Sequence, residues 1–74
     1  QFYDLIFANI LFGPLKKLAP LYSLIIKPNS FLILSGLLNE QIPYIINQYN
    51  NFGFKEKKIF YLNGWGSIIM KRNP

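Results

Sequence analysis

The chain has 74 residues, of which 51% are hydrophobic and 18% aromatic, and its formal net charge at pH 7 is +5. A chain of this length forms at most one small domain with a marginal core, because it buries only about 60% of the surface that its unfolded state exposes. It has no cysteine or histidine and only three carboxylates, which excludes a disulfide framework, thiolate chemistry and histidine acid–base catalysis. No metal site is expected.

The sequence shows no membrane or secretion signal. The uncharged stretch from Pro28 to Asn39 contains Pro, Asn and Ser and falls well short of the roughly 18 apolar residues that a membrane span needs. No signal-peptide pattern is present. The first residue is Gln1, and Phe2 already lies in an apolar run, so we expect a piece of a longer chain.

The first expected element is a strand over residues 2–10. This run is almost continuously apolar, which is typical of a strand buried on both faces of a parallel sheet. Gly13-Pro14 then opens a helix, since Pro is tolerated in the first turn. Its apolar stripe is Leu15, Leu18, Ala19, Tyr22, Ile25 and Ile26. Pro20 lies inside this stripe and predicts either a kink or two short helical segments.

A second strand and a second helix follow. Lys27-Pro28-Asn29 ends the first helix, and residues 31–34 form a strand that ends at Ser35-Gly36. Strand, helix and strand make a right-handed crossover. Asn39 is expected to cap the next helix, and Gly53 to end it. The buried stripe of this helix is Ile42, Ile45, Ile46 and Tyr49.

The chain ends in a predicted antiparallel hairpin. Residues 55–62 and 65–71 flank Asn63-Gly64, a pair that tolerates the positive φ angles of a tight turn. Tyr61 and Trp65 suit either cross-strand packing or an aromatic platform that stacks on RNA, and packing is favoured. The fold class is therefore α/β, with parallel strands and packed helices followed by a β-hairpin.

Asn9 is the principal candidate site residue. In an open α/β sheet, ligands bind beyond the carboxyl ends of the strands, which is where Asn9 is expected. Ser35 and Gly36 leave the second strand and form a second rim of this crevice or a simple turn. Asp4 lies at the opposite end of the first strand and is expected to remain solvated.

Several short motifs together resemble one enzyme family. They are Ala8-Asn9-Ile10-Leu11, Gly13-Pro14-Leu15, Leu18-Ala19-Pro20, Leu34-Ser35-Gly36 and Glu40-Gln41, with Trp65 near the end. Over nearly the whole chain, this set resembles the C-terminal part of PrmA-type methyltransferases. The resemblance implies the second half of a Rossmann-like, class I S-adenosylmethionine-dependent methyltransferase fold, whose last strand inserts antiparallel beside its neighbours. Residues 1–74 would then be the C-terminal portion of a catalytic domain.

The resemblance also implies the site and the reaction. Family members methylate lysine side chains and the N-terminal amine of protein eleven of the large ribosomal subunit, in the cytoplasm. Asn9 would contact S-adenosylmethionine, and Ile10 and Leu11 would line the same pocket. No catalytic residue is assigned, because an asparagine can orient an amine without titrating.

The departures from the family are large. The glycine-rich cofactor loop, the acidic residue expected to bind the ribose and the N-terminal recognition domain have no counterpart here. We therefore expect the isolated chain to be inactive, to require its missing N-terminal half, and to expose its first strand as an aggregation-prone edge.

The basic residues are scattered over several predicted elements, which favours ordinary solvated faces over a nucleic-acid footprint. Direct nucleic-acid binding is therefore not expected. Two alternatives to the enzyme remain: a small basic module that uses its sheet and Trp65 to contact RNA or a ribosomal protein, and a degenerate remnant without activity.

Overall fold

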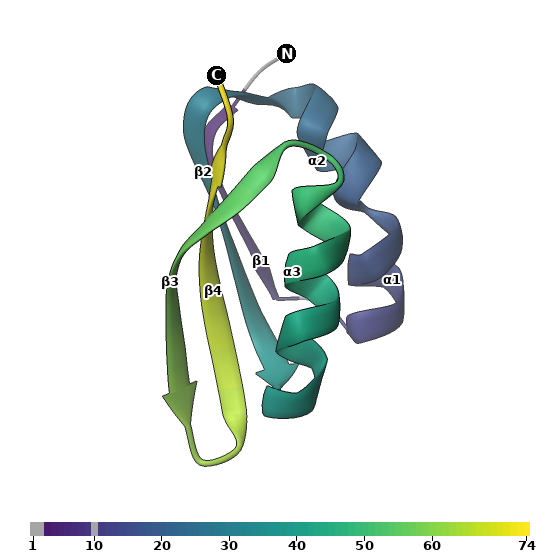
Figure 1. Ribbon diagram of the computed structural model, residues 1–74, viewed down its shortest axis with the longest axis vertical. Helices are drawn as coiled ribbons and strands as arrows, with labels where there is room; N and C mark the ends of the chain where they lie inside the picture. The colour runs from purple at the N-terminus through teal and green to yellow at the C-terminus, as the bar shows by residue number, and fades with distance from the viewer. Residues whose placement is uncertain (1–2, 10) are drawn as a thin grey trace.

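The computed structural model describes residues 3–9 and 11–74 as one four-stranded sheet with helices packed against it (Figure 1). The elements in chain order are β1 (Tyr3–Asn9), α1 (Phe12–Lys17), α2 (Ala19–Ile25), β2 (Ile26–Leu38), the 3₁₀ helix η1 (Asn39–Gln41), α3 (Ile42–Asn50), β3 (Phe54–Leu62) and β4 (Trp65–Arg72).

The strand order is β1-β2-β4-β3, so the last strand of the chain lies between two earlier ones. β1 and β2 are parallel, whereas β4 is antiparallel to both β2 and β3. The hairpin is confirmed, because Asn63 (φ 51°) and Gly64 (φ 83°) form the turn between β3 and β4. The α/β class and the inserted antiparallel strand are therefore both as expected.

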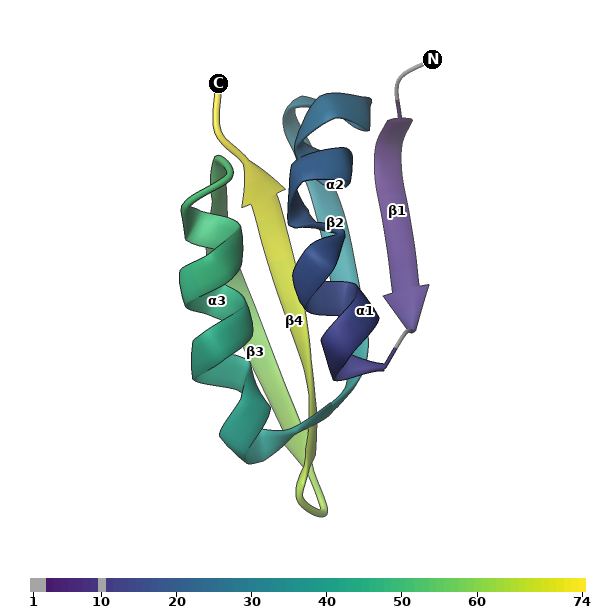
Figure 2. The ribbon, with the colours of Figure 1, turned by 90° about the vertical axis from the view of Figure 1, so that its right-hand side faces the viewer.

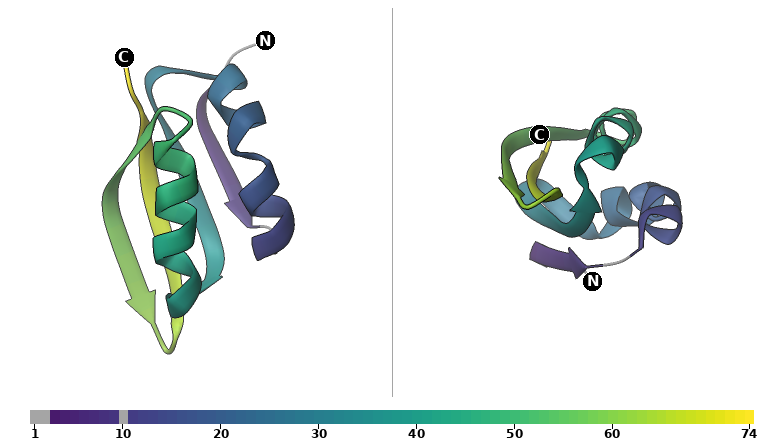
Figure 3. Two further views of the ribbon diagram at one scale, coloured as in Figure 1. Left: turned by 45° about the vertical axis from the view of Figure 1, so that its right-hand side comes forward. Right: turned by 90° about the horizontal axis from the view of Figure 1, so that it is seen from below.

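The helices cover one face of the sheet, as Figures 2 and 3 show. Alternate residues of the central strands point toward them, because successive strand side chains point to opposite faces. The buried core is Ala8, Leu15, Ala19, Tyr22, Ile26, Leu32, Leu34, Leu37, Ile42, Ile45, Tyr49, Phe54, Ile68 and Met70. No described element covers the opposite side of the sheet, which is called the open face below.

The helical segment after β1 is split in two at Leu18, one of the two outcomes expected from Pro20. Its predicted stripe is buried or half-buried throughout. Tyr49 links α3 to α1, because its hydroxyl donates a hydrogen bond of 2.7 Å to the backbone carbonyl of Leu15. Burial, and next the neighbouring Tyr22, raise the pKa of Tyr49 above its ordinary value.

Within the described residues, the first strand is not buried on both faces. Within β1 only Ala8 is buried, while Leu5 and Phe7 are 57% and 65% exposed. The physical reason is that β1 lies at the edge of the sheet, with helices on one side only. Its continuous apolar run therefore places hydrophobic side chains on the open face as well as in the core. The expectation of an apolar edge strand is confirmed.

Two local expectations are also corrected. The second strand is longer than residues 31–34: it begins directly after α2 and continues past Ser35-Gly36, where its register with β4 shifts. Asn39 does not cap the following helix. Instead, the side-chain carbonyl of Gln41 accepts a hydrogen bond of 2.9 Å from the backbone N–H of Leu38.

Candidate functional site

The carboxyl ends of β1 and β2 bring three of the predicted site residues together. Asn9 is paired with Ser35 in the parallel register, and Gly36 follows at once. Gly36 has a φ of 75°, and a Cβ atom added to it would collide with the Oδ1 atom of Asn9. The backbone therefore favours glycine here, and any larger residue would also make the Asn9 side chain shift.

The other two predicted pocket residues are placed differently. Ile10 lies outside the described residues. Leu11 precedes α1 and is 79% exposed. Leu11 does not belong to the lining of the cavity described next.

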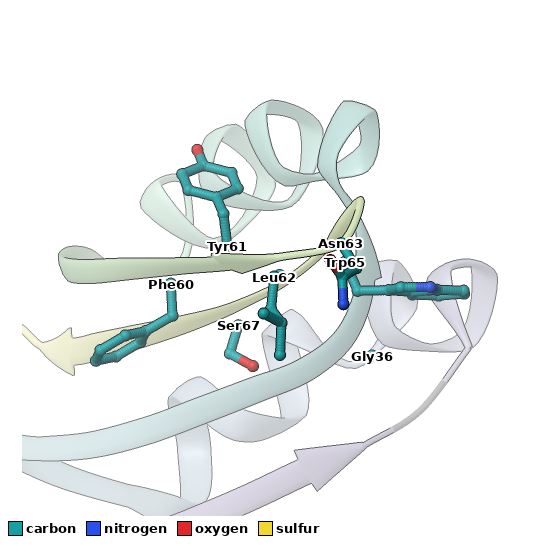
Figure 4. A pocket seen from close by; sticks show the side chains of 8 residues that line it. Gly36, Phe60, Tyr61, Leu62, Asn63, Trp65 and Ser67 are labelled. Atoms are coloured by element: carbon teal, nitrogen blue, oxygen red, sulfur yellow. The ribbon is translucent and has the colours of Figure 1, made fainter.

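A cavity of about 440 Å³ lies between the β3–β4 hairpin and the register shift of β2. Its lining is Gly36, Phe60, Tyr61, Leu62, Asn63, Trp65, Gly66 and Ser67. Figure 4 shows Phe60, Leu62 and Ser67 on one side of the hairpin, Tyr61 on the other, and Trp65 extending past the end of the strands. Gly36 lines this cavity and adjoins the side chain of Asn9, and the cavity together with Asn9 is called the region below.

The hairpin residues of this cavity were not among the predicted site residues. Trp65 and Tyr61 were assigned to packing, but they are 53% and 59% exposed. Trp65 does face Leu62 across the hairpin, as packing requires, yet Leu62 is itself exposed. The sequence did carry a signal for these residues. Side chains alternate between the two faces along each hairpin strand, so Phe60 and Leu62 share one face of β3.

Two hydroxyl groups link the two sides of the region. Ser35 Oγ and Ser67 Oγ share a hydrogen bond of 2.9 Å across β2 and β4. Both side chains are half-buried and lie near apolar neighbours of the open face. This pair fixes the hairpin relative to the end of β2.

The charges around the region provide no acid–base machinery. Asp4 lies at the far end of β1, where an ion pair of 3.2 Å joins it to Lys27. Across residues 3–9 and 11–74, no cluster of three potential metal-ligating side chains occurs. The tyrosines whose pKa is raised by burial, Tyr22 and Tyr49, belong to the core rather than to this region. The arrangement is suited to binding and orientation by amide, hydroxyl and aromatic groups.

None of the helices in the described part of the chain is long and apolar enough to cross a membrane.

The fold defines the class of protein. A parallel βαβ unit with an antiparallel strand inserted beside it is the arrangement of Rossmann-like methyltransferases. A crystal structure of a methyltransferase from Pyrococcus furiosus matches 99% of this chain with a TM-score of 0.78 and 17% identity, over 42% of its own length. At that identity, the likeness concerns the fold.

Comparisons at higher sequence identity identify the family to which the chain belongs. The family described as ribosomal protein L11 methyltransferase (PrmA) matches residues 1–73, and the chain belongs to this family. The crystal structure of a ribosomal protein L11 methylase from Lactobacillus delbrueckii subsp. bulgaricus matches 99% of the chain with a TM-score of 0.91 and 26% identity, over 38% of its length. The ribosomal protein L11 methyltransferase of Hydrogenovibrio crunogenus is 46% identical over 65 residues, which are 88% of this chain and 22% of that protein. The chain thus spans about a quarter of the curated relatives it matches.

Proposed function

We propose that this chain is the C-terminal portion of a catalytic domain that transfers methyl groups from S-adenosylmethionine to amino groups of ribosomal protein L11. The observation that carries the proposal is the placement of Asn9 beside Ser35 and Gly36, where the carboxyl ends of two parallel strands meet. Membership of the family supports the reaction class. Lysine side chains and the N-terminal amine are the expected acceptors.

The residues present fit one side of a cofactor site. The missing Cβ of Gly36 leaves the carboxamide of Asn9 unobstructed, and an amide both donates and accepts hydrogen bonds. Asn9 would therefore hold polar groups of S-adenosylmethionine from this side. When bound, the cofactor supplies a methyl group on a positively charged sulfur, which is the electrophile.

Asn9 would also orient the acceptor. Its carbonyl oxygen accepts an N–H of the neutral amine and so directs the nitrogen lone pair toward the methyl group. This role needs no titrating side chain, which agrees with the lack of histidine in the sequence. The exposed side chains of Leu62 and Trp65 would exclude water from the hairpin side once a substrate covers them.

A chimeric enzyme tests the proposal. The 65 matching residues of the Hydrogenovibrio crunogenus relative are replaced by those of this chain, and methylation of ribosomal protein L11 is measured with labelled S-adenosylmethionine. We expect the chimera to be active. Asn9→Ala should lower kcat/KM by about tenfold to a hundredfold, the usual range for one positioning hydrogen bond in an active site.

The matched control is Asn47→Ala, which removes an exposed amide on α3 without touching the region. Calorimetric titration of S-adenosylmethionine into each chimera separates cofactor binding from turnover. An inactive chimera that is folded and binds the cofactor would contradict the proposed acceptor role. Equal activity of the Asn9 and Asn47 variants would remove Asn9 from the mechanism.

A further inference from the structure

The pairing of β2 with β4 is interrupted near the carboxyl end of β2. Two residues of β2, Ser35 and Gly36, lie there opposite a single residue of β4, Ser67. Such a β-bulge leaves one residue outside the backbone pairing and bends the strand that carries it. The φ of 75° at Gly36 belongs to this bend. The backbone alone therefore holds the hairpin less firmly here than along the rest of β4.

A side-chain hydrogen bond bridges this interruption. Ser35 Oγ and Ser67 Oγ lie 2.9 Å apart, and both side chains are half-buried. A hydroxyl group both donates and accepts, so each serine serves the other without a charged partner. Hydrogen bonds between hydroxyl side chains on neighbouring strands stabilise a sheet. The serine pair therefore joins β2 to β4 at the point where the backbone pairing stops.

The serine pair lies between Asn9 and the cavity-lining part of the hairpin, residues 60–63 and 65–67, which we call the hairpin wall. In the parallel register Asn9 is the direct neighbour of Ser35, and in the antiparallel register Phe60 is the direct neighbour of Ser67 (Figure 4). The four residues form one row across all four strands, and the serines occupy its middle. Their bond therefore helps to fix the separation between Asn9 and the hairpin wall.

The other side of the hairpin is held by the segment that leads into α3. The backbone N–H of Asn39 donates a hydrogen bond of 3.0 Å to the carbonyl of Gly64. A Cβ atom added to Gly66 would collide with the side chain of Ile42, so β4 packs closely against the start of α3. The hairpin wall is thus held on both sides, and the serine pair is its link toward Asn9.

We propose that Ser35 and Ser67 are positioning residues for methyl transfer. Their bond holds the hairpin wall at the distance from Asn9 that keeps the acceptor amine facing the methyl group. This inference rests on the proposed function and adds two residues to it. Methyl transfer requires the nitrogen, the methyl carbon and the sulfur in line, so a small displacement of the acceptor slows it steeply. Loss of the bond should therefore slow turnover and leave cofactor binding almost unchanged.

The test introduces Ser35→Ala, Ser67→Ala and both together into the chimeric enzyme, which is built to include both serines. Turnover is counted per cofactor site titrated by calorimetry, so that a change in the folded fraction does not affect it. We expect kcat to fall about threefold to tenfold, while KM for ribosomal protein L11 and the Kd of S-adenosylmethionine change less than about twofold. Because the serines act through one bond, the double variant should lose no more than either single variant. Ser67→Thr keeps the hydroxyl group and should retain turnover.

Ser23→Ala is the matched control, because it removes an exposed hydroxyl on α2 that donates a hydrogen bond of 2.8 Å to the carbonyl of Pro20. Tyr49→Phe controls for stability, since it breaks a buried bond between helices and should leave kcat per cofactor site unchanged. Equal losses in Ser23→Ala or in Tyr49→Phe would overturn the proposal. Losses that multiply in the double serine variant would also overturn it, because they would show that the two hydroxyls act separately.

Amide hydrogen exchange separates this inference from the proposed function. In the serine variants the amides of residues 62–67 should exchange about threefold to tenfold faster, and those of α3 should not change. Unchanged exchange in the hairpin would overturn the inference even in an active chimera. Faster exchange with unchanged turnover would reduce the serine pair to a structural contact. A folded but inactive parent chimera would overturn the proposed function, and exchange in the hairpin would still decide whether the serine pair holds the wall.

Discussion

Gly36 is the residue on which the geometry around Asn9 most directly depends. Gly36→Ala adds a Cβ at a φ of 75° and forces it against the carboxamide of Asn9. We expect a loss of about 1–2 kcal/mol in the free energy of unfolding from the strained backbone. We also expect the Asn9 side chain to move, so that kcat/KM of the chimera falls further than the stability loss alone explains.

Gly64→Ala is the control for this variant. Gly64 has a φ of 83°, yet an added Cβ there would meet no atom within 4 Å. The two substitutions therefore share the backbone strain and differ in the contact with Asn9. Urea unfolding and methyl-transfer assays on both variants separate these effects, and similar activity losses in the two would show that Gly36 acts through stability alone.

Tyr49 joins α3 to α1 through a buried hydrogen bond to the carbonyl of Leu15. Tyr49→Phe keeps the ring but leaves that carbonyl without its donor, which should cost about 1–3 kcal/mol. Tyr44→Phe, at a tyrosine that is 67% exposed on the same helix, should change the free energy of unfolding by less than about 0.5 kcal/mol. Urea unfolding at neutral pH measures both, and a neutral Tyr49 variant would contradict the assigned bond.

The raised pKa of Tyr49 predicts a loss of stability in alkali. In the unfolded chain the phenol ionises near its ordinary pKa of 10.0, whereas in the folded chain burial keeps it protonated to higher pH. Unfolding therefore releases a proton above about pH 10, and stability falls there by up to about 1.4 kcal/mol per pH unit. The slope should be smaller in Tyr49→Phe, measured by urea unfolding between pH 9 and about pH 11. Equal slopes would show that other groups cause the loss.

At the scale of elements, Arg72 at the end of β4 joins α2 to the turn between α3 and β3. Its Nη1 donates to the carbonyl of Gly53 and its Nε to the carbonyl of Ser23, each at 3.2 Å. Arg72→Met keeps an apolar stem over Phe54 but removes the donors, so we expect a loss of about 1–3 kcal/mol in the free energy of unfolding. Lys57→Met, on β3, is the control. Equal urea midpoints for the two variants would show that these bonds contribute nothing measurable.

The elements that could be predicted from the sequence are those with strong local signals. The Asn63-Gly64 turn and the buried stripe of α3 depend on neighbouring residues and lie where the pattern placed them. Pro20 likewise signalled the break in the preceding helix, which falls at Leu18. The burial of β1 could not be predicted in this way, because the same apolar run suits a central strand and an edge strand. The site shows the same division. Asn9 and Gly36 are local signals, whereas the contact between Ser35 and Ser67 exists only through the pairing of β2 with β4.

At the scale of the whole molecule, the two edges of the sheet differ. The β3 edge carries lysines and a register shift between Glu56 and Lys58. Both features hinder pairing with the strand of another chain. The β1 edge carries exposed apolar side chains, including Leu5 and Phe7, and a single acidic residue. In the isolated 74-residue chain, association between copies is therefore expected at β1 rather than at β3.

Phe7→Lys tests this expectation, because it places a charge on the exposed side of β1 without reaching the core. We expect the variant to remain monomeric at concentrations where the unchanged chain self-associates, as measured by sedimentation velocity. Leu24→Lys removes a comparably exposed apolar side chain from α2 and should leave association unchanged. Equal effects of the two substitutions would assign association to general surface hydrophobicity. An effect of Phe7→Lys alone would assign association to the β1 edge. A second copy covering that edge would bury the new lysine, and burying an unpaired charge is strongly unfavourable.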